Sequence, residues 1–169
     1  MSIFDRDDSP SRLPVSLVTG FLGSGKTTLI NKLLRHPGMG DSALIVNEFG
    51  DVALDHLLIE RIDGETVLLP SGCICCAVRS DLEQALTDLF WKRREGQVPP
   101  FARVLVETTG LADPAPVLQL LLNNPMVAAR YRLDATVATV DAVHAPAQLD
   151  AHAESLKQVA LADRLVLTK

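Results

Sequence analysis

Residues 20–28 read GFLGSGKTT and combine glycine, lysine and hydroxyl side chains at a spacing suited to phosphate binding. They fit the pattern G-x-x-x-x-G-K-[ST], in which glycines allow successive backbone N–H groups to converge on one anion. An apolar run precedes the pattern and a helix-forming run follows it, which is the strand–loop–helix setting of a P-loop. The alternative, a Gly/Ser turn before an ordinary amphipathic helix, is disfavoured because all these features agree. The predicted nucleotide-binding residues are Gly20, Gly23, Ser24, Gly25, Lys26, Thr27 and Thr28.

Two side chains of this segment have a predicted chemical role. Lys26 can reach the β- and γ-phosphates of a nucleotide, and the Thr27 hydroxyl can bind Mg²⁺. A carboxylate for the same ion is predicted at Glu107, which ends an apolar run that a buried strand would place at the sheet edge of the P-loop. Gly110 follows and allows the backbone to approach a γ-phosphate. A strand-end glutamate that faces solvent is the competing interpretation of Glu107.

Three cysteines, Cys73, Cys75 and Cys76, lie within four positions, and the chain has three cysteines in all. A disulfide framework would spread its cysteines along the chain, so the cluster indicates metal or redox chemistry. Thiolates are soft ligands for Zn²⁺, Cu⁺ and similar ions. Because a closed structural zinc site takes four protein ligands, three thiols in C-x-C-C spacing favour an open or exchangeable metal site. A redox role, or plain burial of small side chains, is the alternative.

A polar segment, NEFGD at residues 47–51, follows a strand candidate where switch elements lie in P-loop folds. Its groups are candidates to sense the γ-phosphate or to add oxygen ligands near the cysteines, and an Asn/Gly turn explains the segment nearly as well. Glu48, Asp51 and Glu107 are the candidates for orienting the attacking water. The four histidines are scattered, and we predict none of them as a ligand.

The composition restricts the class of protein. The 169 residues suffice for one domain with a sizeable core, and with 47% apolar but 4% aromatic residues that core must consist of Val, Leu, Ile and Ala. Such a core suits a buried, mostly parallel sheet. A net charge of −5 without a long basic run argues against nucleic acid as a partner. The sequence contains neither a signal-peptide core nor a membrane-length apolar stretch, which predicts a cytoplasmic location and no membrane partner.

Strand and helix candidates alternate along the chain and predict an α/β fold, a P-loop NTPase with a mostly parallel sheet flanked by helices. We expect residues 1–12 to form a flexible leader and residues 13–169 to form one nucleotide-binding domain. The chain stops just past an apolar strand candidate, so we expect a fold truncated at its C-terminal end. The predicted strands are 15–19, 43–46, 66–69, 103–107, 135–140 and 164–167, and the predicted helices are 27–34, 81–94, 114–122 and roughly 153–161.

The series GFLGSGKTT, NEFGD, GCICC and ETTGLADP, followed by a strand that ends in Thr168 and Lys169, resembles the CobW-like GTPases. The resemblance covers residues 13–169 and implies a P-loop GTPase of the metallochaperone type. It implies that nucleotide state and metal affinity are coupled through the switch segments. It also implies that Lys26, Thr27 and Glu107 serve nucleotide and Mg²⁺, and that Cys73, Cys75 and Cys76 bind Zn²⁺ or the related ions Co²⁺, Ni²⁺ or Fe²⁺.

The chain matches the guanine-reading motif of that family, [NT]-K-x-D, only at its first two positions, Thr168 and Lys169, where the sequence ends. The preference for GTP over ATP therefore rests on the resemblance, and we expect a C-terminal domain to be absent.

Together these observations predict a slow GTPase domain that binds GTP, Mg²⁺ and a transition metal and delivers the metal to a client metalloprotein. A homodimer is left open. Two alternatives are a small-molecule kinase on the same fold, which would need an arginine-bearing lid, and a metal-binding module without hydrolysis. The basic cluster at residues 92–94 ends a predicted helix and does not resemble such a lid.

Overall fold

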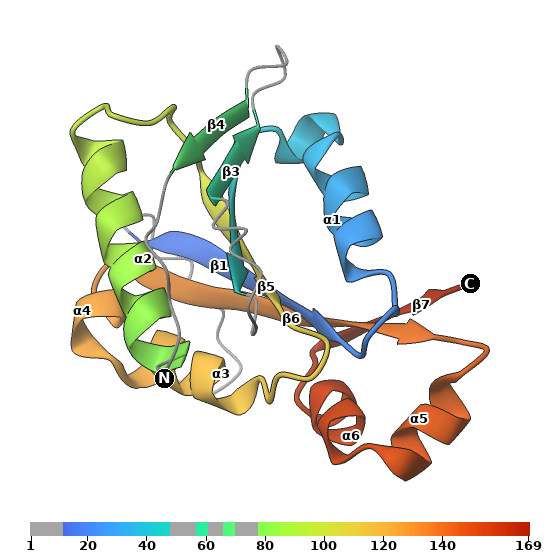
Figure 1. Cartoon of the computed structure of the whole chain (residues 1–169). Helices are drawn as coiled ribbons and strands as arrows, with labels where there is room; N and C mark the ends of the chain where they lie inside the picture. The colour runs from blue at the N-terminus through green and yellow to red at the C-terminus, as the bar shows by residue number, and fades with distance from the viewer. Residues whose placement is uncertain (1–11, 48–56, 61–65, 70–77) are drawn as a thin grey trace.

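The computed structural model describes residues 12–47, 57–60, 66–69 and 78–169, and Figure 1 shows their arrangement. Within these residues seven strands form one sheet in the order β4-β3-β2-β5-β1-β6-β7. Strands β2, β5, β1, β6 and β7 are parallel to one another. Strands β3 and β4 extend the sheet beyond β2, and each pairs with its neighbour in the antiparallel direction. The strands are β1 (Leu13–Gly20), β2 (Ser42–Asn47), β3 (Leu57–Glu60), β4 (Thr66–Leu69), β5 (Arg103–Thr108), β6 (Tyr131–Asp141) and β7 (Arg164–Thr168).

Helices connect the parallel strands and cover both faces of the sheet (Figure 1). Helix α1 lies on one face, and α2 lies on the other, where α3 and α4 accompany it. Helix α6 packs against β1 and β6. The helices are α1 (Lys26–Leu34), the 3₁₀ helix η1 (Pro37–Met39), α2 (Val78–Arg94), α3 (Ala115–Asn123), α4 (Pro125–Ala128), α5 (Ala145–Ala151) and α6 (Ala153–Ala160).

The alternation of side chains along each strand decides which helix a residue contacts. Val15 and Leu17 of β1 join a buried cluster with α2, α3 and α4, whereas Val18 joins a second cluster with Ile30 and Leu34 of α1. Because both faces are covered, the central strands are apolar almost throughout, as expected for a parallel sheet.

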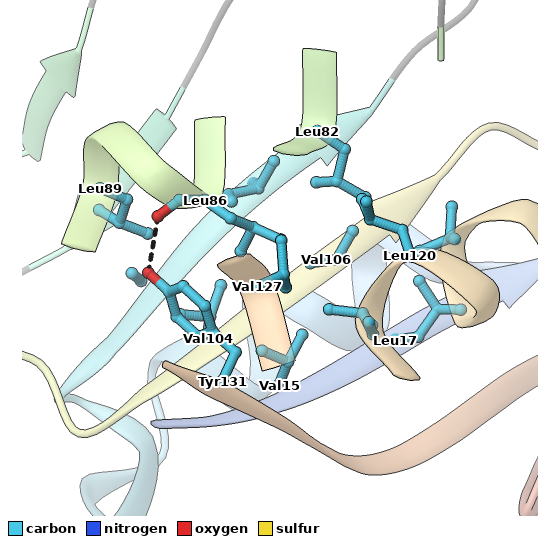
Figure 2. Packing of buried hydrophobic residues seen from close by; sticks show 14 of the residues in the cluster. Val15, Leu17, Leu82, Leu86, Leu89, Val104, Val106, Leu120, Val127 and Tyr131 are labelled. Carbon is cyan, nitrogen blue, oxygen red and sulfur yellow. Dashed lines mark hydrogen bonds between the residues drawn. The ribbon is translucent and has the colours of Figure 1, made fainter. Parts of the chain in front are cut away.

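Figure 2 shows the larger cluster, in which Leu82, Leu86 and Leu89 of α2 lie above the central strands. Tyr131 is the largest fully buried side chain of the described residues, and its hydroxyl donates a hydrogen bond to the Leu86 carbonyl at 2.9 Å. This bond satisfies a polar group that would otherwise be costly to bury, and burial raises the pKa of Tyr131. The core is therefore continuous from α2 to the start of β6.

The predicted fold class is confirmed: the chain forms an α/β fold of the P-loop NTPase type, with a mostly parallel sheet flanked by helices. All predicted strands and helices are present, although β6 begins at Tyr131 rather than at residue 135 because its first residues pair with β1. Strand β3 and the helices η1, α4 and α5 were not predicted. None of the helices in the described part of the chain has the length and apolar character needed to cross a bilayer.

Helix α4 was missed because its first residues resemble a turn. The Asn-Asn-Pro sequence at residues 123–125 is typical of a turn, but in the structure Asn124 and Pro125 start this helix. The Asn124 side chain accepts hydrogen bonds from the N–H groups of Met126 at 2.9 Å and Val127 at 3.2 Å. An asparagine at a helix N-terminus followed by proline favours a helix start as well as a turn, so the local sequence permitted both interpretations.

Leu86→Ala tests the packing between α2 and the sheet. Leu86 is completely buried, so we expect the free energy of unfolding to fall by about 2–5 kcal/mol in urea denaturation. Leu122→Ala is the matched control, since Leu122 is 59% exposed on α3 and should change stability by less than about 0.5 kcal/mol. Equal losses for the two variants would contradict this core.

Candidate functional site

The P-loop connects the end of β1 to the start of α1 and depends on glycine at three places. Gly20, Gly23 and Gly25 have φ angles of 143°, 70° and 91°, in the range that other residues rarely adopt. A Cβ atom at Gly20 would lie 2.5 Å from the Thr139 carbonyl oxygen and 2.7 Å from Ser24 Oγ. The end of β1 is therefore pressed against β6, and the loop conformation is fixed by contacts on that side.

The Ser24 hydroxyl also joins the P-loop to β6. Its Oγ lies 2.6 Å from Thr139 Oγ1 in a buried hydrogen bond, and Thr139 in turn donates to the Thr19 carbonyl at 3.3 Å. Ser24 and Thr139 are both almost completely buried. A buried hydroxyl pair of this kind holds the loop in one arrangement, because breaking it would leave polar atoms without partners.

Lys26 lies at the first position of α1 and folds back over the loop. Its Nζ donates hydrogen bonds to the carbonyl oxygens of Gly20 at 2.9 Å and Phe21 at 3.2 Å. The amine therefore lies on the loop itself, at the N-terminal end of a helix, where the helix dipole favours an anion.

Thr27 and Glu107 lie close together although 80 residues separate them in the sequence. The Thr27 hydroxyl donates to Glu107 Oε1 at 2.9 Å, and Glu107, 6% exposed, lies near the end of β5, the strand next to β1. Its side chain faces the site rather than solvent, which disagrees with the competing interpretation of a solvent-facing glutamate. The neighbouring Thr108 donates to Thr19 Oγ1 at 2.9 Å and so ties the same strand end to β1.

The β5–α3 loop, residues 109–114, passes directly beside the P-loop. A Cβ atom at Gly110 would lie 2.6–2.8 Å from side-chain and backbone atoms of Leu22. Only glycine permits this approach without a shift of the P-loop. Next to it, Thr109 Oγ1 is buried and has no hydrogen-bond partner among the described residues.

The end of β7 closes the site on the other side. Thr168 Oγ1 donates to the Ser24 carbonyl at 2.7 Å, and Lys169 Nζ donates to the Gly23 carbonyl at 2.7 Å and to Asp141 Oδ2 at 3.0 Å. The hydrogen bond from Lys169, with a smaller contribution from His144, holds the pKa of the Asp141 carboxyl well below its usual range. Lys169 therefore bridges β6 and the P-loop through these two hydrogen bonds.

The structure brings most of the predicted site residues together at one sheet edge. The two threonines after Lys26, Thr27 and Thr28, are exposed on the first turn of α1. Glu48, Asp51, Cys73, Cys75 and Cys76 lie outside the described residues, and the described residues contain no group of three or more potential metal ligands. The residues that meet at the edge are Gly20, Gly23, Ser24, Gly25, Lys26, Thr27, Glu107, Gly110, Thr168 and Lys169.

Three residues that support the site were not predicted from the sequence: Thr139, Asp141 and Gln158. Asp141 had a usable signal, because it is an acidic residue at the end of a strand candidate, in a position similar to that of Glu107. Thr139 is an ordinary residue for a strand, and its contact with the P-loop depends on the tertiary fold. Gln158 is a buried amide on a short helix of mixed polar and apolar residues, and no local pattern distinguishes it from an exposed glutamine.

Comparison with known proteins identifies the group to which this arrangement belongs. Residues 14–169, nearly all of the chain, match the family CobW/HypB/UreG, nucleotide-binding domain. The chain belongs to this family. The resemblance to CobW-like GTPases seen in the sequence motifs is thereby confirmed.

Two curated proteins are similar in sequence to this chain over nearly its whole length. The zinc chaperone YjiA of Escherichia coli (strain K12) is 42% identical over 157 residues, which are 93% of this chain and 49% of the relative. Zinc-regulated GTPase metalloprotein activator 1 of Schizosaccharomyces pombe is 32% identical over 174 residues, which are 99% of this chain and 41% of the relative. The chain spans about half the length of the curated relatives it matches.

A solved structure of the family has the same fold. The crystal structure of Zn(II)-bound YjiA GTPase from E. coli superposes with a TM-score of 0.69 at 41% sequence identity, over 94% of this chain and 49% of that chain. The sheet and the P-loop edge described above therefore belong to a CobW-family domain.

Gly20→Ala tests the close packing of the P-loop against β6. The variant should lose about 2–6 kcal/mol of unfolding free energy, because backbone strain of about 1–3 kcal/mol adds to overpacking of about 1–3 kcal/mol. Gly96→Ala is the control: Gly96 has a φ of 70°, but a Cβ atom there would meet no other atom within 4 Å, so strain of about 1–2 kcal/mol alone is expected. Chemical denaturation measures the free energy of unfolding of both variants. Equal losses of stability would contradict the close contacts described at Gly20.

Proposed function

We propose that this chain is the nucleotide-binding part of a zinc-chaperone GTPase, which binds and hydrolyses GTP and couples its nucleotide state to a metal ion that it passes to a client protein. The observation that carries the proposal is the Thr27–Glu107 contact of 2.9 Å beside Lys26 and the P-loop. Membership of the CobW/HypB/UreG family and the names of the relatives, a zinc chaperone and a zinc-regulated GTPase activator, support it.

The P-loop is suited to hold the phosphates of GTP. Donors already occupy the carbonyl oxygens of Gly20, Phe21, Gly23 and Ser24. Because a planar peptide holds its C=O and the following N–H in opposite directions, fixing these carbonyls also fixes the N–H groups of the loop. When a nucleotide enters, Lys26 can exchange the carbonyls of Gly20 and Phe21 for phosphate oxygens, which form stronger charge-assisted hydrogen bonds.

Thr27 and Glu107 fit a Mg²⁺ ion by the chemistry of their donors. A hydroxyl and a carboxylate are oxygen ligands of the kind that Mg²⁺ prefers, and in this structure they lie within hydrogen-bond distance of each other. The buried Thr109 hydroxyl beside them, unpartnered among the described residues, is a further polar group that bound water or a phosphate can satisfy. When bound, Mg²⁺ supplies positive charge that offsets the charge of the β- and γ-phosphates.

Hydrolysis in this proposal depends on positioning and electrostatics. Lys26 and the loop N–H groups stabilise negative charge at the phosphates, while Glu48, Asp51 and Glu107 are the candidates for orienting water. Glu107 alone of the three lies in the described residues, and it faces Thr27. We expect turnover to be slow without a partner, because phosphoryl transfer in such folds gains much of its rate from an added arginine.

The kinase alternative is disfavoured by the position of the basic cluster. Lys92, Arg93 and Arg94 lie at the C-terminal end of α2, and Arg93 Nε donates to the Phe101 carbonyl at 2.9 Å just before β5 begins. The P-loop lies at the opposite edge of the sheet, where β1 and β5 end. This cluster therefore cannot cover the phosphates as an arginine-bearing lid would.

The metal in this proposal is cargo held by Cys73, Cys75 and Cys76. Three thiolates leave one position of a tetrahedral zinc site for a water molecule, a carboxylate such as Glu48 or Asp51, or a group from a second molecule. An open position allows a client thiol or imidazole to take the ion, which a closed four-cysteine site would resist. Zn²⁺ is the first choice because the relatives are named for zinc.

Lys26→Ala tests nucleotide binding. We expect Mg-GDP to bind about 100-fold more weakly or worse, since Lys26 contributes charge-assisted hydrogen bonds of about 1.5–3 kcal/mol each, and thermal unfolding should change little. Lys32→Ala, an exposed lysine further along the same helix, is the matched control and should bind as the parent does. Isothermal titration calorimetry measures the Mg-GDP affinity of the parent, of Lys26→Ala and of Lys32→Ala. Parent-like affinity in Lys26→Ala would refute the P-loop assignment.

The coupling of metal and nucleotide is tested by zinc competition against a chromophoric chelator, with GDP and with a non-hydrolysable GTP analogue. The proposal expects the zinc affinities in the two nucleotide states to differ, and the same factor must appear in nucleotide affinity with and without zinc. Replacing Cys73, Cys75 and Cys76 by serine should abolish the competition. Equal zinc affinity in both states would leave a metal site without nucleotide control, and unchanged binding in the serine variant would place the metal elsewhere.

A further inference from the structure

Helix α6 buries the polar side chain of Gln158 in the protein interior. Ser155 and Gln158 are its buried residues, and Gln158 is 1% exposed. A buried amide is costly unless its hydrogen-bonding groups are satisfied. Gln158 Nε2 donates to the carbonyl oxygens of Gly110 and Ala112, both at 3.1 Å. The helix therefore contacts the β5–α3 loop through one amide that holds two loop carbonyls.

The loop segment held by Gln158 is the part that touches the P-loop. On one side of Gly110 lies Leu22, at the distance that excludes a Cβ atom, and on the other side the Gln158 amide binds its carbonyl. Fixing the carbonyls of Gly110 and Ala112 fixes the peptide planes that follow them. Gln158 therefore holds the β5–α3 loop in its conformation beside the P-loop.

A second, exposed contact holds the same loop to α6. Lys157 Nζ donates to Asp113 Oδ2 at 2.7 Å, while Asp113 Oδ1 accepts the N–H of Ala115 at the start of α3. The Lys157 hydrogen bond lowers the pKa of the Asp113 carboxyl, and the carboxylate raises the pKa of Lys157. Because this pair is solvent-exposed it contributes little free energy compared with the buried amide.

Helix α6 is also connected to the P-loop at both of its ends. His152, which precedes the helix, stacks on Phe21 with ring centroids 4.5 Å apart. The strand that follows the helix is β7, whose Thr168 binds the Ser24 carbonyl. The P-loop and the β5–α3 loop are thus both anchored to the α6–β7 unit.

We propose that Gln158 is a positioning residue for the triphosphate: by holding the carbonyls of Gly110 and Ala112 it keeps the β5–α3 loop in place for the γ-phosphate. This inference rests on the proposed nucleotide function. A loop held in advance does not have to be ordered when ligand binds, so the ordering cost is avoided. A diphosphate ends one phosphate earlier and does not require this loop, so the contribution of Gln158 appears in triphosphate binding and not in diphosphate binding.

Gln158→Met tests this inference, because methionine has a similar length but no donor. Mg-GDP and a non-hydrolysable Mg-GTP analogue are titrated into the full chain, and the ratio of their dissociation constants is the readout. We expect the variant to weaken analogue binding about tenfold, which is about 1.4 kcal/mol, and to leave GDP affinity within about twofold. Gln148→Met, the same change on the neighbouring helix α5, should leave the ratio unchanged.

The outcomes separate this inference from the proposed function. If the parent chain binds neither nucleotide, the proposed function fails and this inference fails with it. If the parent binds both and Gln158→Met lowers both affinities equally, or neither, Gln158 has a structural role alone and the inference is wrong. Should Gln158→Met fail to fold, Gln158→Asn keeps a buried amide but shortens the side chain by one methylene, which draws its donor away from the carbonyls of Gly110 and Ala112. An analogue-to-GDP ratio of dissociation constants raised severalfold in that variant supports the inference, and an unchanged ratio overturns it.

Discussion

The shared direction of the parallel strands is the constraint on which the candidate site depends. Strands β5, β1 and β6 are neighbours and end at the same edge of the sheet, so the polar groups that follow each strand meet there although they are far apart in sequence. Ligands of open α/β sheets bind outside this edge. For this reason Glu107 of β5 lies close enough to bind Thr27, and Thr139 of β6 lies close enough to bind Ser24. A change in strand order would separate these groups even if every local element were preserved.

Buried threonines make this edge compatible with a core. Thr19, Thr108 and Thr139 are at most 2% exposed, and as β-branched residues they suit strands. Their hydroxyls bond to one another's strands and to the P-loop, which removes the cost of burying them. The same three strands thus change from an apolar core to a polar binding edge within one or two residues, and the P-loop rests on a network that resists rearrangement.

A feature could be predicted from the sequence when the residues that define it are close together along the chain. The P-loop depends on glycines and on one lysine within a short segment, and Glu107 follows an apolar run near the end of its strand, so both could be recognised from neighbouring residues alone. Gln158 could not, because its two partners lie more than forty residues away in the sequence and a glutamine within a short helix is usually exposed. Strand β3 was missed for a related reason, since its pairing with β2 and β4 gives a short strand its stability.

The net charge of the whole chain does not describe the surroundings of the P-loop, and the hydrogen bonds show why. The net charge is −5, yet an anion would meet the ammonium groups of Lys26 and Lys169 and the N-terminal end of α1. Asp141 accepts hydrogen bonds from Lys169 and from the backbone N–H groups of Val143 and His144. Because the Asp141–Lys169 pair is close to neutral, the attraction for an anion comes mainly from Lys26 and the helix end. Each lysine is held by loop carbonyls rather than extended into water, so little side-chain entropy is lost when a phosphate arrives. Local preorganisation, and not the overall charge, therefore decides whether this edge attracts an anion.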